Sequence, residues 1–192
     1  RRCSRPCSSR SEVAVSTGDF AARIAALQRE LGIPADYAER SGLALQPEPE
    51  TLVEVSPGRT ERRHWLEPFA AARWAAMEAA AEGDGIRLVL VSAWRSVAYQ
   101  RGIIERKLAR GEAIERILAV NAAPGYSEHH GGRAVDLGVP GRAPLTEAFE
   151  ETEAFRWLSR NAGRFGFALS YPRDNAHGIV YEPWHWAIPG GA

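Results

Sequence analysis

The sequence predicts an α+β fold, in which a small central antiparallel sheet is flanked by helices and preceded by an N-terminal helical extension. Apolar residues recur at helical spacing in several long segments, whereas the apolar runs typical of strands are short. Long connections join these short runs, and helices precede as well as separate them. A doubly wound parallel sheet would instead require strands and helices that alternate regularly. We therefore expect one small sheet.

The first 60 residues are expected to form an extension outside the main domain. Residues 1–16 are polar and basic. A helix is predicted next, because Thr17 and Asp19 can cap a turn and the apolar residues after it recur at helical spacing, namely Phe20, Ile24, Leu27 and Leu31. The proline-rich stretch 42–60 is interpreted as a linker or a long surface segment.

Residues 61–192 are expected to form the main domain, with helices and strands in turn. The predicted helices are a segment with Trp65, Phe69, Ala72, Ala76 and Ala80 on one face, then 97–108, 112–120 and a part of 145–165. The predicted strands are 86–91, 134–137, 167–171 and 179–186. A turn around residues 172–178 separates the last two strands.

Composition and charge narrow the class of protein. A chain of 192 residues can bury a core without a disulfide scaffold, and 45% hydrophobic and 25% charged residues are ordinary globular values. Lys plus Arg and Asp plus Glu number 24 each, so no excess charge favours binding to nucleic acid. No apolar run approaches the ~18 residues of a membrane span, and no signal peptide is visible. Cys3 and Cys7 either pair across a small loop or lie free in the polar tail.

Histidines and carboxylates gather in two segments of the C-terminal half, 127–136 and 181–186. Imidazole nitrogens and carboxylate oxygens are good zinc ligands, and a catalytic zinc typically takes three protein ligands. Two glycines shortly after His129 permit the close backbone approach that would turn its ring toward the strand bearing Asp136. Together with His185, these two residues are candidate ligands of one divalent ion.

Each of these residues, taken alone, has a simpler structural explanation. A single histidine in a loop is usually solvated, and Asp136 can cap a turn. His185 between two tryptophans can be a core histidine, and Glu182 beside a proline can be a surface carboxylate. His130 is expected to face solvent rather than substrate. The coincidence of three ligands, a spare carboxylate and a glycine-rich loop favours the metal site.

Three ordered motifs strengthen this interpretation. Residues 127–136 match S-x-H-x-x-G-x-A-x-D at every fixed position, and residues 182–185 match E-x-W-H. Residues 92–96 read Ser-Ala-Trp-Arg-Ser and are followed by Tyr-Gln at 99–100. Together the motifs resemble those of the VanY-type D-alanyl-D-alanine carboxypeptidases, whose third motif reads S-G-Y-R-S…Y-Q, so Ala93 and Trp94 depart from it. This family belongs to a wider group with lysostaphin-like peptidases and the hedgehog signalling domain.

The resemblance implies roles for seven residues and covers the chain from about 65 to 188. It implies that His129, Asp136 and His185 hold one zinc ion on the central sheet and that Glu182 is the general base. It also implies that Arg95 is a positive group facing the scissile carbonyl. Ser127 and Gln100 would contact the substrate's terminal carboxylate. Positions i and i+3 of a regular strand face opposite sides, so Pro183 is expected to introduce a bend that turns both Glu182 and His185 inward.

The function that the resemblance implies is hydrolysis of the D-Ala-D-Ala, or a related D-amino-acid, terminus of peptidoglycan stem peptides. An endopeptidase of the same fold, as in phage lysins, is the first alternative. A non-catalytic zinc-containing binding module is the second, but a purely structural site is usually closed by a fourth protein ligand and needs no base such as Glu182. We expect a monomer, located in the cell envelope or periplasm because of its substrate.

Overall fold

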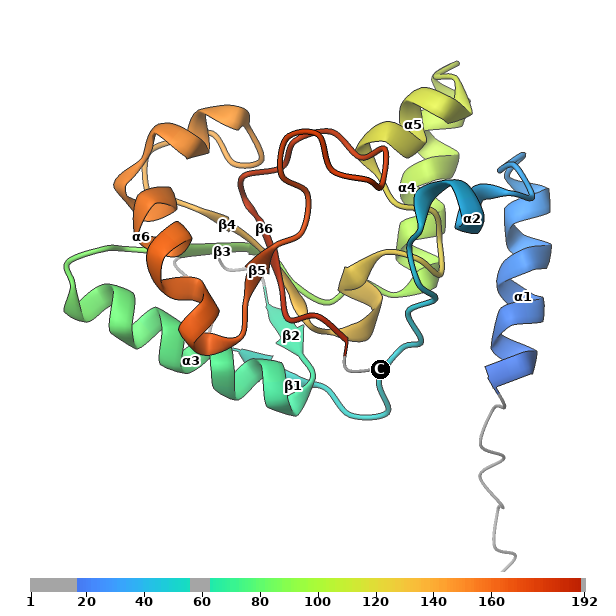
Figure 1. The fold of residues 1–192 in the computed structure, drawn as a ribbon. Coiled ribbons are helices and arrows are strands. Elements are labelled where there is room, and N and C mark those ends of the chain that lie inside the picture. Colours follow the sequence, from blue (N-terminus) through green and yellow to red (C-terminus); the bar gives the residue numbers. More distant parts are fainter. Residues whose placement is uncertain (1–16, 56–62, 191–192) are drawn as a thin grey trace, which may run out of the picture.

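The computed structural model describes residues 17–55 and 63–190, and a four-stranded antiparallel sheet lies at its centre (Figure 1). The strand order is β3 (Val89–Ser92), β4 (Ala134–Gly138), β6 (His185–Ala187) and β5 (Ala168–Leu169). Every neighbouring pair runs antiparallel. The predicted α+β class with a small central sheet is confirmed. The polar tail with Cys3 and Cys7 lies outside the described residues.

A second, two-stranded sheet was not expected from the sequence. It pairs β1 (Val53–Val55) with β2 (His64–Leu66). The stretch 42–60, interpreted as a linker or a long surface segment, thus contains a strand that was not predicted, and its residues 56–60 lie outside the described residues. The assignment of Trp65 to a helix is also wrong, because it lies in β2, where its carbonyl accepts a hydrogen bond from the Trp94 N–H (2.9 Å). Three-residue strands are too short to show a clear alternating pattern.

Most of the predicted helices are confirmed. The α-helices are α1 (Thr17–Glu30), α2 (Tyr37–Ser41), α3 (Pro68–Gly83), α4 (Val97–Ala109), α5 (Ile114–Val120) and α6 (Glu153–Asn161). Short 3₁₀ helices accompany them, namely η1 (Glu128–Gly131), η2 (Glu147–Glu151) and η3 (Ala162–Phe165). Among the α-helices of residues 17–55 and 63–190, only α2 was not predicted, since a five-residue helix carries little periodic signal.

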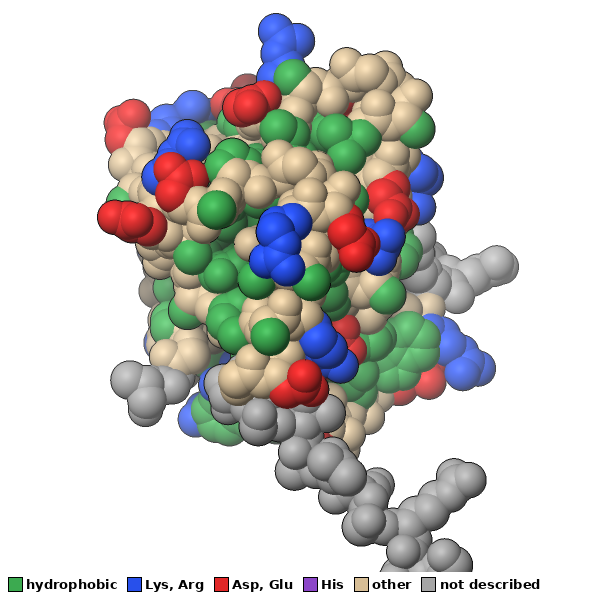
Figure 2. Space-filling view, turned by 90° about the vertical axis from the view of Figure 1, so that its right-hand side faces the viewer, with side chains coloured by type: hydrophobic (Ala, Val, Ile, Leu, Met, Phe, Trp, Pro, Cys, Tyr) green, Lys and Arg blue, Asp and Glu red, His purple; other side chains and the backbone are tan. Residues whose placement is uncertain are grey.

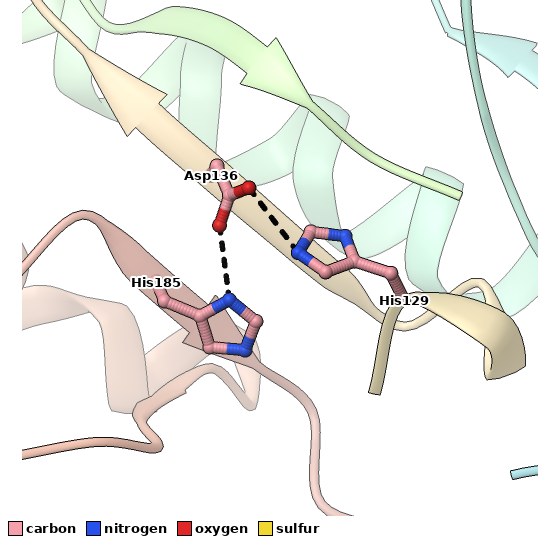
Figure 3. A group of neighbouring side chains, drawn as sticks. All are labelled: His129, Asp136 and His185. Carbon is pink, nitrogen blue, oxygen red and sulfur yellow. Dashed lines mark hydrogen bonds and ion pairs between the residues drawn. The ribbon is translucent and has the colours of Figure 1, made fainter. Parts of the chain in front are cut away.

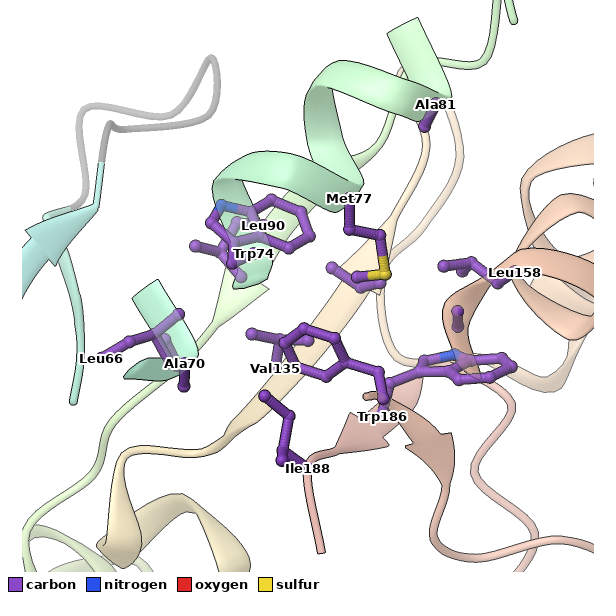
Figure 4. Packing of buried hydrophobic residues seen from close by; sticks show 14 of the residues in the cluster. Leu66, Ala70, Trp74, Met77, Ala81, Leu90, Val135, Leu158, Trp186 and Ile188 are labelled. Carbon is purple, nitrogen blue, oxygen red and sulfur yellow. The ribbon is translucent and has the colours of Figure 1, made fainter. Parts of the chain in front are cut away.

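The main core lies between α3, α6 and the central sheet (Figure 4). The buried face of α3 differs from the predicted one: it consists of Ala70, Ala71, Trp74, Met77 and Ala81, whereas Phe69 is 50% exposed. Trp74 and Met77 pack toward Leu90 of β3 and Val135 of β4. An alanine-rich helix shows little contrast between its faces, so the sequence does not indicate which side turns inward.

Three predicted strands have different bounds in the structure. The strand predicted over 86–91 begins only at Val89. Of the strand predicted over 167–171, only the two residues of β5 are present as a strand. The last strand, predicted over 179–186, begins at His185, directly after a turn that contains Pro183. A proline cannot donate to a strand ladder, which explains the late start of β6.

The N-terminal extension packs on the main domain. Leu31, Ile33 and Tyr37 form a buried cluster with Ile104 of α4 and Ile117 of α5. The Tyr37 hydroxyl also accepts a hydrogen bond from the backbone N–H of residue 123 (3.0 Å). The predicted division of the chain at residue 60 stays a prediction.

The face of the molecule on the right of Figure 1 carries charges of both signs (Figure 2). Arg101 of α4 bonds Glu105 one turn further along and Glu30 of α1, at 2.6 and 3.3 Å. Positive side chains on this face are therefore interspersed with negative ones. None of the helices in the described part of the chain combines the length and the apolar composition that a membrane crossing requires.

Candidate active site

The three candidate ligands come from neighbouring parts of the fold. His129 lies in η1, Asp136 lies in β4, and His185 begins β6. The register of the sheet sets Asp136 directly opposite His185, so their side chains are cross-strand neighbours on one face. One ligand atom from each of the three residues lies within 4.8 Å of the others (Figure 3). The structure thus brings together the three side chains that the sequence proposed.

A glycine turn directs His129 toward the sheet. Gly132 ends η1 with φ +68°, a left-handed conformation that favours glycine. A side chain there would place its Cβ 2.9 Å from the backbone nitrogen of Glu67, which donates a hydrogen bond to the Gly132 carbonyl (3.0 Å). The expected need for glycine after His129 is confirmed at this position.

The hydrogen bonds of His129 leave one ring nitrogen available to a metal ion. Its Nδ1 lies 2.6 Å from the carbonyl oxygen of Ala93, which can only accept, so Nδ1 carries the proton. Its Nε2 is buried without a hydrogen-bond partner, 3.2 Å from Oδ2 of Asp136. Burial, with the nearby charge of Arg95, lowers the pKa of His129 to about 4. His129 is therefore a neutral imidazole that turns a lone pair toward Asp136.

Asp136 and His185 form a buried charged pair. Oδ1 of Asp136 lies 2.9 Å from Nδ1 of His185, and Nε2 of His185 lies 2.8 Å from Oε2 of Glu128. Burial by itself lowers the pKa of His185, but the two carboxylates outweigh it and raise this pKa to about 10. Burial raises the pKa of Asp136, yet His129, His185 and Arg95 hold it well below its usual range. The positively charged imidazole of His185 therefore lies between the carboxylates of Asp136 and Glu128.

The two imidazoles and the carboxylate fit a divalent metal ion. Zinc accepts a donor set of two nitrogens and one oxygen from a protein, and in such sites a fourth coordination position remains for a non-protein ligand. The unpartnered Nε2 of His129 supports this fit, because a buried ring nitrogen normally has a hydrogen-bond partner.

Glu182 lines a pocket together with His129 and His185, and it begins a tight turn. Its carbonyl accepts a hydrogen bond from the His185 N–H (3.0 Å), with Pro183 at the second position of the turn, where proline is favoured. The bend expected at Pro183 is therefore present, although Glu182 lies before the strand and not in it. Burial, with the negative charges of Asp136 and Glu128, raises the pKa of Glu182 to about 7. Such a carboxyl group can both accept and release a proton near neutral pH.

Arg95, Gln100 and Ser127 line this pocket with His129, Glu182 and His185. Arg95 Nη2 donates to Asp136 Oδ2 (3.1 Å), and its Nη1 donates to Gln100 Oε1 (3.4 Å). Gln100 Nε2 in turn donates to the carbonyl of Ala122 (2.9 Å), so this amide fixes the position of the guanidinium. The Ser127 hydroxyl does not cap η1.

The structure also assigns contacts that the sequence did not predict. His130 is fully buried rather than solvent-facing, and its Nδ1 lies 2.6 Å from the carbonyl of Arg95, which it holds in place. The Tyr171 ring packs on His185, with centroids 4.9 Å apart. Glu128 contacts His185 from within η1. These contacts join segments distant in sequence, so no local pattern signals them.

Two imidazoles, a carboxylate, an ionisable carboxyl group and a guanidinium therefore meet beside one small sheet. Such a set of groups is typical of metallohydrolases, a class in which three side chains hold a metal ion and a carboxyl group moves protons. The family can be stated as well. The chain belongs to the VanY family, described as D-alanyl-D-alanine carboxypeptidase, whose sequence model matches residues 63–190.

Individual relatives and solved structures agree with this family. The chain is 32% identical over 171 residues to YodJ of Bacillus subtilis (strain 168), to which a carboxypeptidase function is attributed. The match covers 87% of this chain but only 60% of the length of YodJ. Its structure resembles the LD-carboxypeptidase LdcB with a TM-score of 0.68 and 30% identity, covering 74% of this chain and 70% of LdcB. It also resembles a variant of the D,D-pentapeptidase VanY in complex with Zn(II), with a TM-score of 0.57 and 27% identity, covering 78% and 88% of the two chains.

Proposed function

We propose that this chain is a zinc metallocarboxypeptidase that removes the terminal residue from D-Ala-D-Ala, or related D-amino-acid, ends of peptidoglycan stem peptides. The observation that carries the proposal is the convergence of three ligand atoms within 4.8 Å, beside a pocket that Glu182 and Arg95 line together with His129 and His185. Membership of a D-alanyl-D-alanine carboxypeptidase family supports the substrate class.

One zinc ion is proposed to bind His129, Asp136 and His185, as the Zn(II) complex of a VanY variant supports. When bound, zinc supplies Lewis-acid chemistry: it polarises a carbonyl and lowers the pKa of water. His129 is suited to this role because it is neutral and its Nε2 is unpartnered.

The remaining side chains are proposed to move the proton and position the substrate. Glu182 accepts a proton from the attacking water and delivers it to the leaving amine, for which its pKa near neutral pH is suited. The Arg95 guanidinium stabilises the negative charge that develops on the carbonyl oxygen. Ser127 and Gln100, at 5% and 1% exposure, bind the terminal carboxylate deep in the pocket.

The proposed contacts to a terminal carboxylate favour removal of a terminal residue over internal cleavage. Ser127 and Gln100 are buried and line the pocket. An internal stem-peptide bond would offer them no terminal carboxylate. The endopeptidase of the same fold is the first alternative.

A second candidate substrate is a stem peptide with a single terminal D-alanine after an L-configured centre. The structural similarity to the LD-carboxypeptidase LdcB favours this candidate. Both reactions release a terminal D-amino acid and use the same groups.

We also propose that the enzyme acts as a monomer in the cell envelope. Every candidate site residue comes from this one chain, and its proposed substrate is part of the wall.

Mass spectrometry of products from defined muropeptides tests the proposal. The zinc-loaded chain is incubated separately with a pentapeptide, a tetrapeptide and a cross-linked dimer. Loss of one alanine from the pentapeptide is the expected result. Loss of alanine only from the tetrapeptide would support the second candidate, and cleavage only of the dimer would support the endopeptidase. An absence of all products would refute a peptidase function on these substrates.

A further inference from the structure

His185 contacts two different carboxylates through its two ring nitrogens. Nδ1 lies 2.9 Å from Oδ1 of Asp136, and Nε2 lies 2.8 Å from Oε2 of Glu128. Asp136 belongs to the candidate ligand set, whereas Glu128 is outside that set and contacts the other ring nitrogen. The Glu128 side chain is 24% exposed, and the Ser170 side chain also forms a hydrogen bond with it.

The direction of the hydrogen bond to Glu128 determines which nitrogen of His185 can bind a metal ion. An ionised carboxylate only accepts hydrogen bonds, so Nε2 must carry the proton that it donates to Glu128. Nδ1 also faces a carboxylate, that of Asp136, but Asp136 is itself a candidate ligand, so Nδ1 is the nitrogen that would share an ion with it. The same arrangement occurs at His129, where Nδ1–H donates to the Ala93 carbonyl and Nε2 faces Asp136.

Glu128 links the two candidate histidine ligands, His129 and His185. Glu128 and His129 are neighbours in η1, so this one short helix provides a candidate ligand and the partner of a second candidate ligand. The Tyr171 ring, 4.9 Å from the His185 ring, limits its tilt. The imidazole is therefore held at both nitrogens and against one face.

We propose that Glu128 is a positioning residue of the metal centre: its carboxylate fixes the tautomer and the ring orientation of His185, and thereby strengthens metal binding. This inference rests on the proposed function. Residues that orient a ligand in this way typically change metal affinity by about 10–100-fold when they are replaced.

Zinc affinity of the full-length chain, measured by competition with a chromophoric chelator, tests the role of Glu128. Glu128→Gln keeps an acceptor but loses the charge, and Glu128→Leu loses both. We expect zinc dissociation constants raised about tenfold and about a hundredfold, respectively. Glu115→Gln, on the exposed surface of α5, is the matched control and should bind zinc as the wild type does. At saturating zinc, the KM for substrate should change little in the Glu128 variants, because Glu128 is not proposed to touch substrate.

A correctly folded Glu128→Leu protein with wild-type zinc affinity would overturn the inference. If this variant does not fold, as judged by circular dichroism, Glu128→Gln and Ser170→Ala decide the question, and wild-type affinity in both would overturn it equally. The wild-type protein separates this inference from the proposed function. Failure of the wild type to bind zinc refutes the proposed function, whereas tight wild-type binding that the Glu128 variants share refutes only the role of Glu128.

Discussion

Replacing Glu182 by glutamine removes the charge of the proposed general base and keeps the shape of its side chain. We expect hydrolysis to fall by about 10²–10⁴-fold, because glutamine cannot accept a proton, while zinc remains bound. The same substitution should stabilise the metal-free protein at alkaline pH. One residue change thus tests both the catalytic role and the burial of this carboxyl group.

The expected stabilisation follows from the pKa of Glu182. Burial raises this pKa in the folded, metal-free protein from 4.5 to about 7. Between these two pH values the folded state binds a proton that the unfolded state has lost, so the contribution of Glu182 to stability is present at low pH and is lost as the pH rises through 7. A pKa change of this size corresponds to about 3 kcal/mol. The variant, which does not titrate, should avoid this loss.

Thermal or urea unfolding in the presence of a chelator measures this effect. Relative to the wild type, the free energy of unfolding of Glu182→Gln should rise by about 3 kcal/mol between pH 4.5 and pH 8, which corresponds to roughly 6–12 °C in Tm. Glu115→Gln, whose side chain is exposed, is the control and should show no such trend. A stability difference that does not change with pH, or a variant less stable than the wild type at pH 8, would refute the argument from burial. Undiminished turnover would remove Glu182 from its proposed role.

Three further substitutions test other parts of the site. His185→Ala should lose the metal, and elemental analysis that finds a full equivalent of zinc would contradict the ligand assignment. Arg95→Ala should lower kcat/KM by about a hundredfold or more with zinc retained, and unchanged steady-state kinetics would exclude its proposed role at the carbonyl. Gly132→Ala should destabilise the fold by about 1–3 kcal/mol in urea unfolding, because φ is +68° and the added Cβ would lie 2.9 Å from a backbone nitrogen. Gly163→Ala, with open space around it, is the matched control; equal effects of the two substitutions would argue against strain at Gly132.

The sequence by itself determined the candidate metal ligands and much of the local structure. His129, Asp136 and His185 were identified from residue type and motif spacing, and the structure brings their ligand atoms together. The turn at Pro183 and the glycine after η1 were also predictable, because backbone geometry at proline and glycine depends on neighbours only a few positions away. The helix α1 was found from the spacing of its apolar residues.

Only the tertiary structure decided which of these groups touch. The contacts of His185 with Asp136 and with Glu128 join residues 49 and 57 positions apart, and they depend on the register between β4 and β6. Shifting that register by one residue would turn His185 to the other face of the sheet, and no feature of either strand alone fixes the pairing. The burial of His130 against the Arg95 carbonyl likewise arises from packing between distant segments. Residue types and short-range spacing thus indicate the candidate ligands, whereas long-range strand pairing determines that they meet.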